Sequence, residues 1–216
     1  MFPAQFFIAV VVGYLIGSIP SAYLAGRLLK RQDIRRLGDG NVGAENACKE
    51  LGPGIGILVA ALDMSKGAVA VGLMTAAGFS EGAALAAGAA AVVGHNWSMF
   101  LQFRGGRGAA TSAGALIVAL FPVSLISGLI ASALALAGKG TGTAGPLRGR
   151  GGFFSGMVFG AAMFIPLPLL AWVFGYSVNL ILYSIALPIL VGVVHFYQVV
   201  LPFYHRTGRL SPRARE

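Results

Sequence analysis

The chain has few charged residues and almost no cysteine. Of its 216 residues only 11% are charged, whereas 56% are hydrophobic and the mean hydropathy is +0.79. Soluble domains contain about 25% charged residues, so the composition excludes an ordinary soluble domain and predicts an integral membrane protein. The single cysteine, Cys48, cannot form an internal disulfide.

Acidic residues are the scarcest charged group, with 7 Asp and Glu against 16 Lys and Arg. No Ser-His-Asp or Cys-His set can be assembled from so few groups, and no set of ligands has the spacing of a zinc site. We therefore expect no metal and no cofactor. The net charge of +9 does not indicate nucleic-acid binding, because no soluble domain carries it.

Apolar segments recur along the whole chain. A helix that spans a bilayer needs about 20 apolar residues, and we predict seven crossings in an all-α, polytopic membrane protein with one domain, residues 1–216. Two short segments meet at Pro122, either as two tilted crossings or as one broken hairpin, and we favour two crossings. The segments are residues 4–28, 54–77, 83–101, 109–121, 123–137, 153–174 and 177–201.

The Lys and Arg residues outside these segments lie in alternate loops. Short loops rich in Lys and Arg stay cytoplasmic, so the N-terminus is predicted outside and the C-terminus inside. Any chemistry that needs cations must then occur at the inner face. The cationic segments are residues 29–53, 102–108, 138–152 and the tail 202–216.

The first inner loop, residues 29–53, combines turn-forming residues with flanking cations. Such a backbone turns sharply, takes positive φ and can direct several N–H groups into an anion-binding nest. A loop of this length in a compact protein indicates a function. The turn-forming residues are Gly38, Gly40, Asn41, Gly43, Asn46 and Gly52.

The second inner loop has the pattern expected of a phosphate site. Residues 104–108 read Arg-Gly-Gly-Arg-Gly and open into a helix that contains Thr111 and Ser112. Free N–H groups at a helix N-terminus and the planar fork of arginine both bind phosphate. The spacing is not that of a nucleotide P-loop, so ATP is not implied.

Polar residues also occur inside the apolar segments. His95 and Asn96 lie near a helix end, and intramembrane polar groups usually face the protein interior. Asp63 and Lys66 are three residues apart and share a helix face. We interpret them first as a buried pair that holds helices together, with a direct catalytic role as the alternative.

Several blocks of this chain, in the same order, resemble the acyl-phosphate-dependent glycerol-3-phosphate acyltransferases of bacteria, the PlsY family. The blocks are residues 17–23, 38–46, 63–67, 94–95 and 103–111. The resemblance implies a seven-helix enzyme of the bacterial inner membrane with its active site at the cytoplasmic face. The resemblance also implies that the enzyme transfers a fatty acyl group from acyl phosphate to the 1-hydroxyl of glycerol 3-phosphate. The product would be lysophosphatidic acid, for phospholipid synthesis.

The resemblance also implies which residues act. Acyl phosphate is already activated, so the protein must orient two phosphates and stabilise charge on the carbonyl oxygen; the resemblance suggests that a substrate phosphate deprotonates the hydroxyl. We favour a monomer. The expected catalytic residues are Asp39, Asn41, Lys49, His95 and Arg107. Those expected at substrate phosphates are Gly40, Gly43, Asn46, Arg104, Gly105, Gly106, Gly108, Thr111 and Ser155.

The chain departs from the family pattern inside these loops. The family usually has serine, threonine and arginine where this chain has Asp39, Glu45 and Lys49, and it has lysine where this chain has Arg107. The family also carries a His-Arg-x-Asn-Ile block near its C-terminus, followed by glutamate. Neither candidate here, at His195 or at residue 205, has the asparagine or the glutamate.

Two carboxylates in a loop meant for phosphates would repel an anion. One hypothesis is that Arg35, Arg36 or Lys49 neutralises them, and another is that Asp39 serves as a base.

Two other functions compete with acyl transfer. One is a small membrane transporter for a phosphate-bearing metabolite, which broken helices would suit; against it, the cations gather at one face and no internal repeat is visible. The other is a non-catalytic paralogue that binds lipid phosphate.

Overall fold

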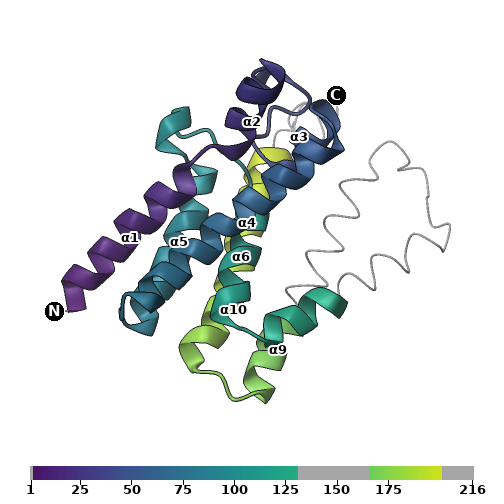
Figure 1. Cartoon of the computed structure of the whole chain (residues 1–216). Helices are drawn as coiled ribbons and strands as arrows, with labels where there is room; N and C mark the ends of the chain where they lie inside the picture. Colours follow the sequence, from purple (N-terminus) through teal and green to yellow (C-terminus); the bar gives the residue numbers. More distant parts are fainter. Residues whose placement is uncertain (1, 131–165, 201–216) are drawn as a thin grey trace, which may run out of the picture.

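The computed structural model describes residues 2–130 and 166–200. Every regular element in these ranges is a helix, as the composition predicted, and the long helices lie side by side in a bundle (Figure 1). The helices are α1 (Phe2–Ser18), α2 (Ser21–Lys30), α3 (Ala44–Glu50), α4 (Pro53–Ala76), α5 (Glu81–Asn96), α6 (Ala109–Ala119), α9 (Pro166–Val173) and α10 (Val178–His195), with short 3-10 helices at Ile34–Arg36 and Met99–Leu101 and a π-helical turn at Phe196–Val200.

Four stretches of the described helices are long and apolar enough to cross a membrane, and each matches one of the predicted crossings. They are Ala4–Lys30, Pro53–Ala76, Glu81–Leu101 and Val178–Gln198. The predicted total of seven crossings and the direction of the termini stay predictions.

The short segments around Pro122 form two helical pieces. The first piece, α6, has 11 residues, which corresponds to about 16 Å and is shorter than the roughly 30 Å hydrocarbon core. Helix resumes at residues 123–130 after a turn at 120–122. The rest of the predicted crossing 123–137, and most of 153–174, lie outside the described residues.

Proline interrupts the first crossing, as its sequence predicts. Pro20 has no N–H to donate, so α1 ends at Ser18 and α2 begins at Ser21. This break redirects the chain into α2, which buries its small residues and ends in cations. The first inner loop therefore starts from a helix that is fixed against the bundle.

Small residues let the helix backbones approach closely. Gly13 and Gly17 of α1 face the backbone of α5, and a Cβ at either position would overlap it. In the same way α4 and α6 meet at Gly67 and Gly114. The contact at Gly67 and Gly114 places the first turn of α6 beside the part of α4 that carries Asp63 and Lys66.

We expect Gly67→Ala to destabilise the bundle, because the added Cβ would overlap the carbonyl of Thr111. Forcing a methyl group into such a contact costs about 1–3 kcal/mol. Thermal unfolding in detergent measures the effect. Gly72→Ala is the matched control on the same helix, because its nearest neighbour is a Val118 methyl at 3.9 Å. Equal melting temperatures for the two variants would contradict the assignment.

Candidate active site

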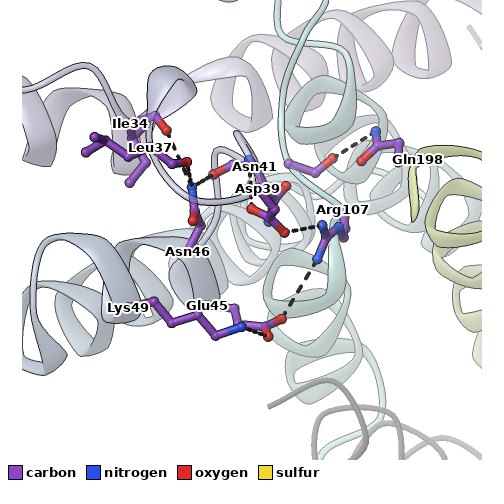
Figure 2. Close-up of polar contacts among 10 residues, drawn as sticks. Ile34, Leu37, Asp39, Asn41, Glu45, Asn46, Lys49, Arg107 and Gln198 are labelled. Atoms are coloured by element: carbon purple, nitrogen blue, oxygen red, sulfur yellow. Dashed lines mark hydrogen bonds and ion pairs between the residues drawn. The ribbon is translucent and has the colours of Figure 1, made fainter. Parts of the chain in front are cut away.

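The two glycine-rich inner loops meet at one end of the bundle, as their predicted common face requires. Arg107 in the second loop contacts Asp39 in the first, with Nη2 2.5 Å from Oδ2, and its Nη1 lies 3.8 Å from Glu45 Oε2. Glu45 also pairs with Lys49 at 2.7 Å. We call Asp39, Glu45, Lys49 and Arg107 the inter-loop cluster (Figure 2).

Asp33 fixes the start of the first loop. Its carboxylate accepts hydrogen bonds from the Arg35 backbone N–H and side chain, and from Arg27 at 3.2 Å. The side-chain hydrogen bond from Arg35 lowers the pKa of Asp33 to about 2, so this carboxylate is charged at neutral pH. Arg35 therefore neutralises Asp33, whereas Lys49 and Arg107 neutralise the two carboxylates that depart from the family pattern.

Asn46 holds the middle of the first loop together. Its side chain is buried, and Nδ2 donates to the carbonyls of Leu37 and Asn41 at 3.0 Å each, with the Ile34 carbonyl at 3.4 Å (Figure 2). An amide that donates to several turns of one loop fixes their relative positions. In this structure Asn46 organises the loop, and its contact with a substrate phosphate stays a prediction.

The glycines of the first loop take positive φ, with one exception. Gly38, Gly40 and Gly52 have φ of 56°, 72° and 109°. Gly43 instead has an extended φ of −142° and precedes α3. The positive φ predicted for this loop is therefore confirmed at Gly38, Gly40 and Gly52, but not at Gly43.

The second loop is docked on the end of α5 and opens into α6. The N–H groups of Gly105 and Gly106 donate to the carbonyls of Asn96 and His95 at 3.0 Å each. Gly108, with φ of 78°, precedes the first residue of α6, and within the described ranges no side-chain hydrogen bond caps this helix. The N–H groups of Gly105 and Gly106 are therefore already paired with the end of α5. The backbone N–H groups that this loop can offer to an anion are those of the first turn of α6.

A buried charged group lies under the second loop. Lys66 Nζ is 2.6 Å from Asp63 Oδ1, which also lies 3.6 Å from His95 Nδ1, and all three side chains are at most 6% exposed. The predicted buried pair is confirmed, with His95 added. A Cβ on Gly106 would overlap His95 Nε2, so the loop packs directly on this ring.

Comparison with known proteins agrees with this geometry. A family model described as glycerol-3-phosphate acyltransferase matches residues 7–207. The chain belongs to this family. It is 41% identical to glycerol-3-phosphate acyltransferase 4 of Dehalococcoides mccartyi (strain ATCC BAA-2266 / KCTC 15142 / 195) over 189 residues, which cover 87% of this chain and 93% of the relative.

Solved structures of the acyltransferase family are also similar. The crystal structure of PlsY, an integral membrane glycerol 3-phosphate acyltransferase, in its glycerol 3-phosphate form matches with a TM-score of 0.73 and 29% identity. The lysophosphatidic acid form matches with a TM-score of 0.71 and 27% identity. Each comparison covers 94% of this chain and 93% of the other.

Most site residues expected from the acyltransferase resemblance lie at this end of the bundle. Asn41 donates its backbone N–H to Asp39, and its Oδ1 is buried without a partner among the described residues. The Thr111 hydroxyl, in the first turn of α6, is likewise buried and unpartnered there. Arg104 is exposed. Ser155 lies outside the described residues.

Two residues join this region that the sequence did not single out for a function. Ser98 Oγ donates to the carbonyl of Ser18 at 2.5 Å, which links the segment after α5 to the break in the first crossing. Gln198, beyond α10, donates to the carbonyl of Gly106 at 3.4 Å. Ser98 belongs to no motif in this chain, whereas Gln198 ends the candidate block at His195 that lacks the family's asparagine and glutamate. Only the fold brings both residues to the loops.

We expect Asn46→Asp to loosen the first loop, because an oxygen would replace the donor that faces the carbonyls of Leu37 and Asn41. A lost buried hydrogen bond of this kind costs about 1–3 kcal/mol. The rate of trypsin cleavage after Arg35 and Arg36 should rise at unchanged detergent and temperature. Cys48→Ala, an exposed change on the same helix, serves as the control, and equal cleavage rates for both variants would exclude this role of Asn46.

Proposed function

We propose that this protein transfers a fatty acyl group from acyl phosphate to the 1-hydroxyl of glycerol 3-phosphate, giving lysophosphatidic acid. The observation that carries the proposal is the meeting of two glycine-rich cationic loops, bridged by Arg107, in a chain that belongs to the acyltransferase family. The forms of PlsY named for glycerol 3-phosphate and for lysophosphatidic acid support the same acceptor and product.

The proposed acceptor site lies between Arg107 and the first turn of α6. Arginine binds two phosphate oxygens through its planar fork, and the N–H groups of an uncapped helix N-terminus favour an anion. Gly108 and Thr111 are the α6-side residues of this site. Asn41, Lys49 and His95 would then line the donor side and the reacting centre.

The proposal includes an orientation in the membrane. Seven crossings with the N-terminus outside would place both loops at the cytoplasmic face of a bacterial cell membrane, where short cationic loops remain. A single chain carries all the proposed site residues, so a monomer suffices. No covalent enzyme intermediate is needed, because acyl phosphate already carries a good leaving group.

We expect Arg107→Ala to lower kcat/KM about 10- to 100-fold, the loss corresponding to a charge-assisted hydrogen bond to phosphate. Purified protein in detergent receives palmitoyl phosphate and labelled glycerol 3-phosphate, and lysophosphatidic acid is measured. Arg107→Lys should retain more activity, because it keeps the charge but loses the fork.

Arg36→Ala is the matched control for charge. It removes one cation from the same end of the bundle, and Arg36 makes no ion pair within the part of the chain that the structure describes. Wild-type protein that makes no lysophosphatidic acid would contradict the proposal. Flux of a phosphate-bearing metabolite into sealed vesicles, without new lipid, would favour a transporter instead.

We expect Asp39→Ser to lower the KM for glycerol 3-phosphate a few-fold. The Asp39 carboxylate accepts a hydrogen bond from Arg107 Nη2 in the structure. Removing this carboxylate leaves the guanidinium free to bind the substrate phosphate. The same assay measures KM and kcat separately, with Glu50→Gln as a control for loss of a nearby exposed carboxylate. A large fall in kcat at unchanged KM would instead assign proton transfer to Asp39.

A further inference from the structure

A small pocket lies between the break in the first crossing and the second inner loop. It is distinct from the first turn of α6, to which the proposed function assigns the acceptor phosphate. Apolar residues Ile19 and Leu101 line part of it. Its polar and glycine lining includes Ser18, Ser21, Lys66, His95, Ser98, Gly105 and Gly106.

Lys66 brings a buried ammonium group to this pocket. Its side chain is 6% exposed, and its Nζ donates to Asp63 Oδ1. An ammonium group has three N–H donors, and Asp63 is the only hydrogen-bond acceptor that Lys66 has among the described residues. Two of its donors thus have no acceptor in the described part of the chain, and a buried donor without an acceptor costs free energy.

Ser18 supplies a second donor from another helix. The residue is fully buried, and its Oγ has no partner within residues 2–130 and 166–200. Its backbone is fixed, because its carbonyl accepts the hydrogen bond from Ser98. The Ser18 hydroxyl therefore makes no hydrogen bond that stabilises the described fold. The backbone that carries it is nevertheless fixed.

The electrostatics of the pocket favour one oxygen rather than a whole phosphate. The carboxylate of Asp63 offsets the positive charge of Lys66 at 2.6 Å, so the pair has no net charge with which to hold a dianion. It nevertheless offers preorganised donors to an oxygen that gains charge during a reaction. Donors of this kind, held in a site from which water is excluded, are effective in stabilising an oxyanion.

We propose that this pocket is the oxyanion site of the acyl transfer, in which Lys66 Nζ and Ser18 Oγ donate to the carbonyl oxygen of the acyl donor. The inference rests on the proposed function and adds the group that stabilises its transition state. Asp63 is a positioning residue, since it holds Lys66 in place. The apolar lining by Ile19 and Leu101 suits the start of the acyl chain.

The chemical step balances with these groups alone. The 1-hydroxyl oxygen of glycerol 3-phosphate bonds to the carbonyl carbon, and the carbonyl π electrons move to the oxygen that Lys66 and Ser18 face. The C=O bond then re-forms and the bond from carbon to the phosphate oxygen breaks. Inorganic phosphate leaves with the proton of the hydroxyl, and the protein is unchanged.

Ser18→Ala is the sharpest test. Because the hydroxyl has no partner in the described fold, its removal should leave the melting temperature unchanged. It should lower kcat about 100-fold, the typical effect of losing one oxyanion donor, with the KM for glycerol 3-phosphate within twofold. Tyr183→Phe is the matched control. It also removes a buried hydroxyl that has no partner among the described residues, but from α10 and away from the pocket, so kcat should not change.

A second variant tests the cation. The double change Lys66→Met with Asp63→Asn removes both charges together, so no unpaired charge stays buried, and kcat should fall about 100- to 1000-fold. If this variant does not fold, Ser18→Ala alone decides. A kcat for Ser18→Ala within threefold of the wild type, or a loss confined to the KM for glycerol 3-phosphate, would overturn the oxyanion site while leaving the proposed function intact. A wild-type protein without acyltransferase activity overturns both.

Discussion

The arrangement of the proposed site depends on two loops that the fold fixes separately, and the contact between Arg107 and Asp39 bridges them. This contact joins two loops that are 68 residues apart in the chain and that arise from different pairs of helices. Each loop is separately fixed, the first by Asn46 and Asp33, and the second by its docking on the end of α5. Because each loop is fixed by its own contacts, the ion pair between Arg107 and Asp39 bridges the loops without having to hold either one in place.

The departures from the family pattern occur in contacting pairs. Asp39 stands where the family has serine, and its partner Arg107 stands where the family has lysine. Glu45 and Lys49, which replace threonine and arginine, also pair with each other. A new carboxylate in each case faces a cation that can neutralise it, so the changes compensate one another locally. This pairing explains how the proposed phosphate site tolerates two acidic residues.

The sequence predicted the parts of this structure that follow from local rules. The length of the apolar segments predicted the four helices that can cross a membrane. The missing N–H of Pro20 predicted the break in the first of them. The helical repeat predicted the contact between Asp63 and Lys66. Local rules did not predict the short helix α3 or the contact between Arg107 and Asp39, because tertiary packing decides them. The same holds for Ser18, because only the fold shows that its hydroxyl is buried without a partner in the described part of the chain.

The net charge of the inter-loop cluster decides how it can bind phosphate. Two cations and two carboxylates sum to zero, whereas the family residues at these positions would sum to two positive charges. A substrate phosphate that binds Arg107 as proposed must therefore displace Asp39 from it, because the cluster carries no net positive charge. The Asp39 side chain is 49% exposed, and an exposed ion pair is worth about 0–1 kcal/mol. Breaking the ion pair between Asp39 and Arg107 therefore lowers the affinity for phosphate by less than about a factor of five. The gain from a bidentate contact between arginine and phosphate is larger than this loss.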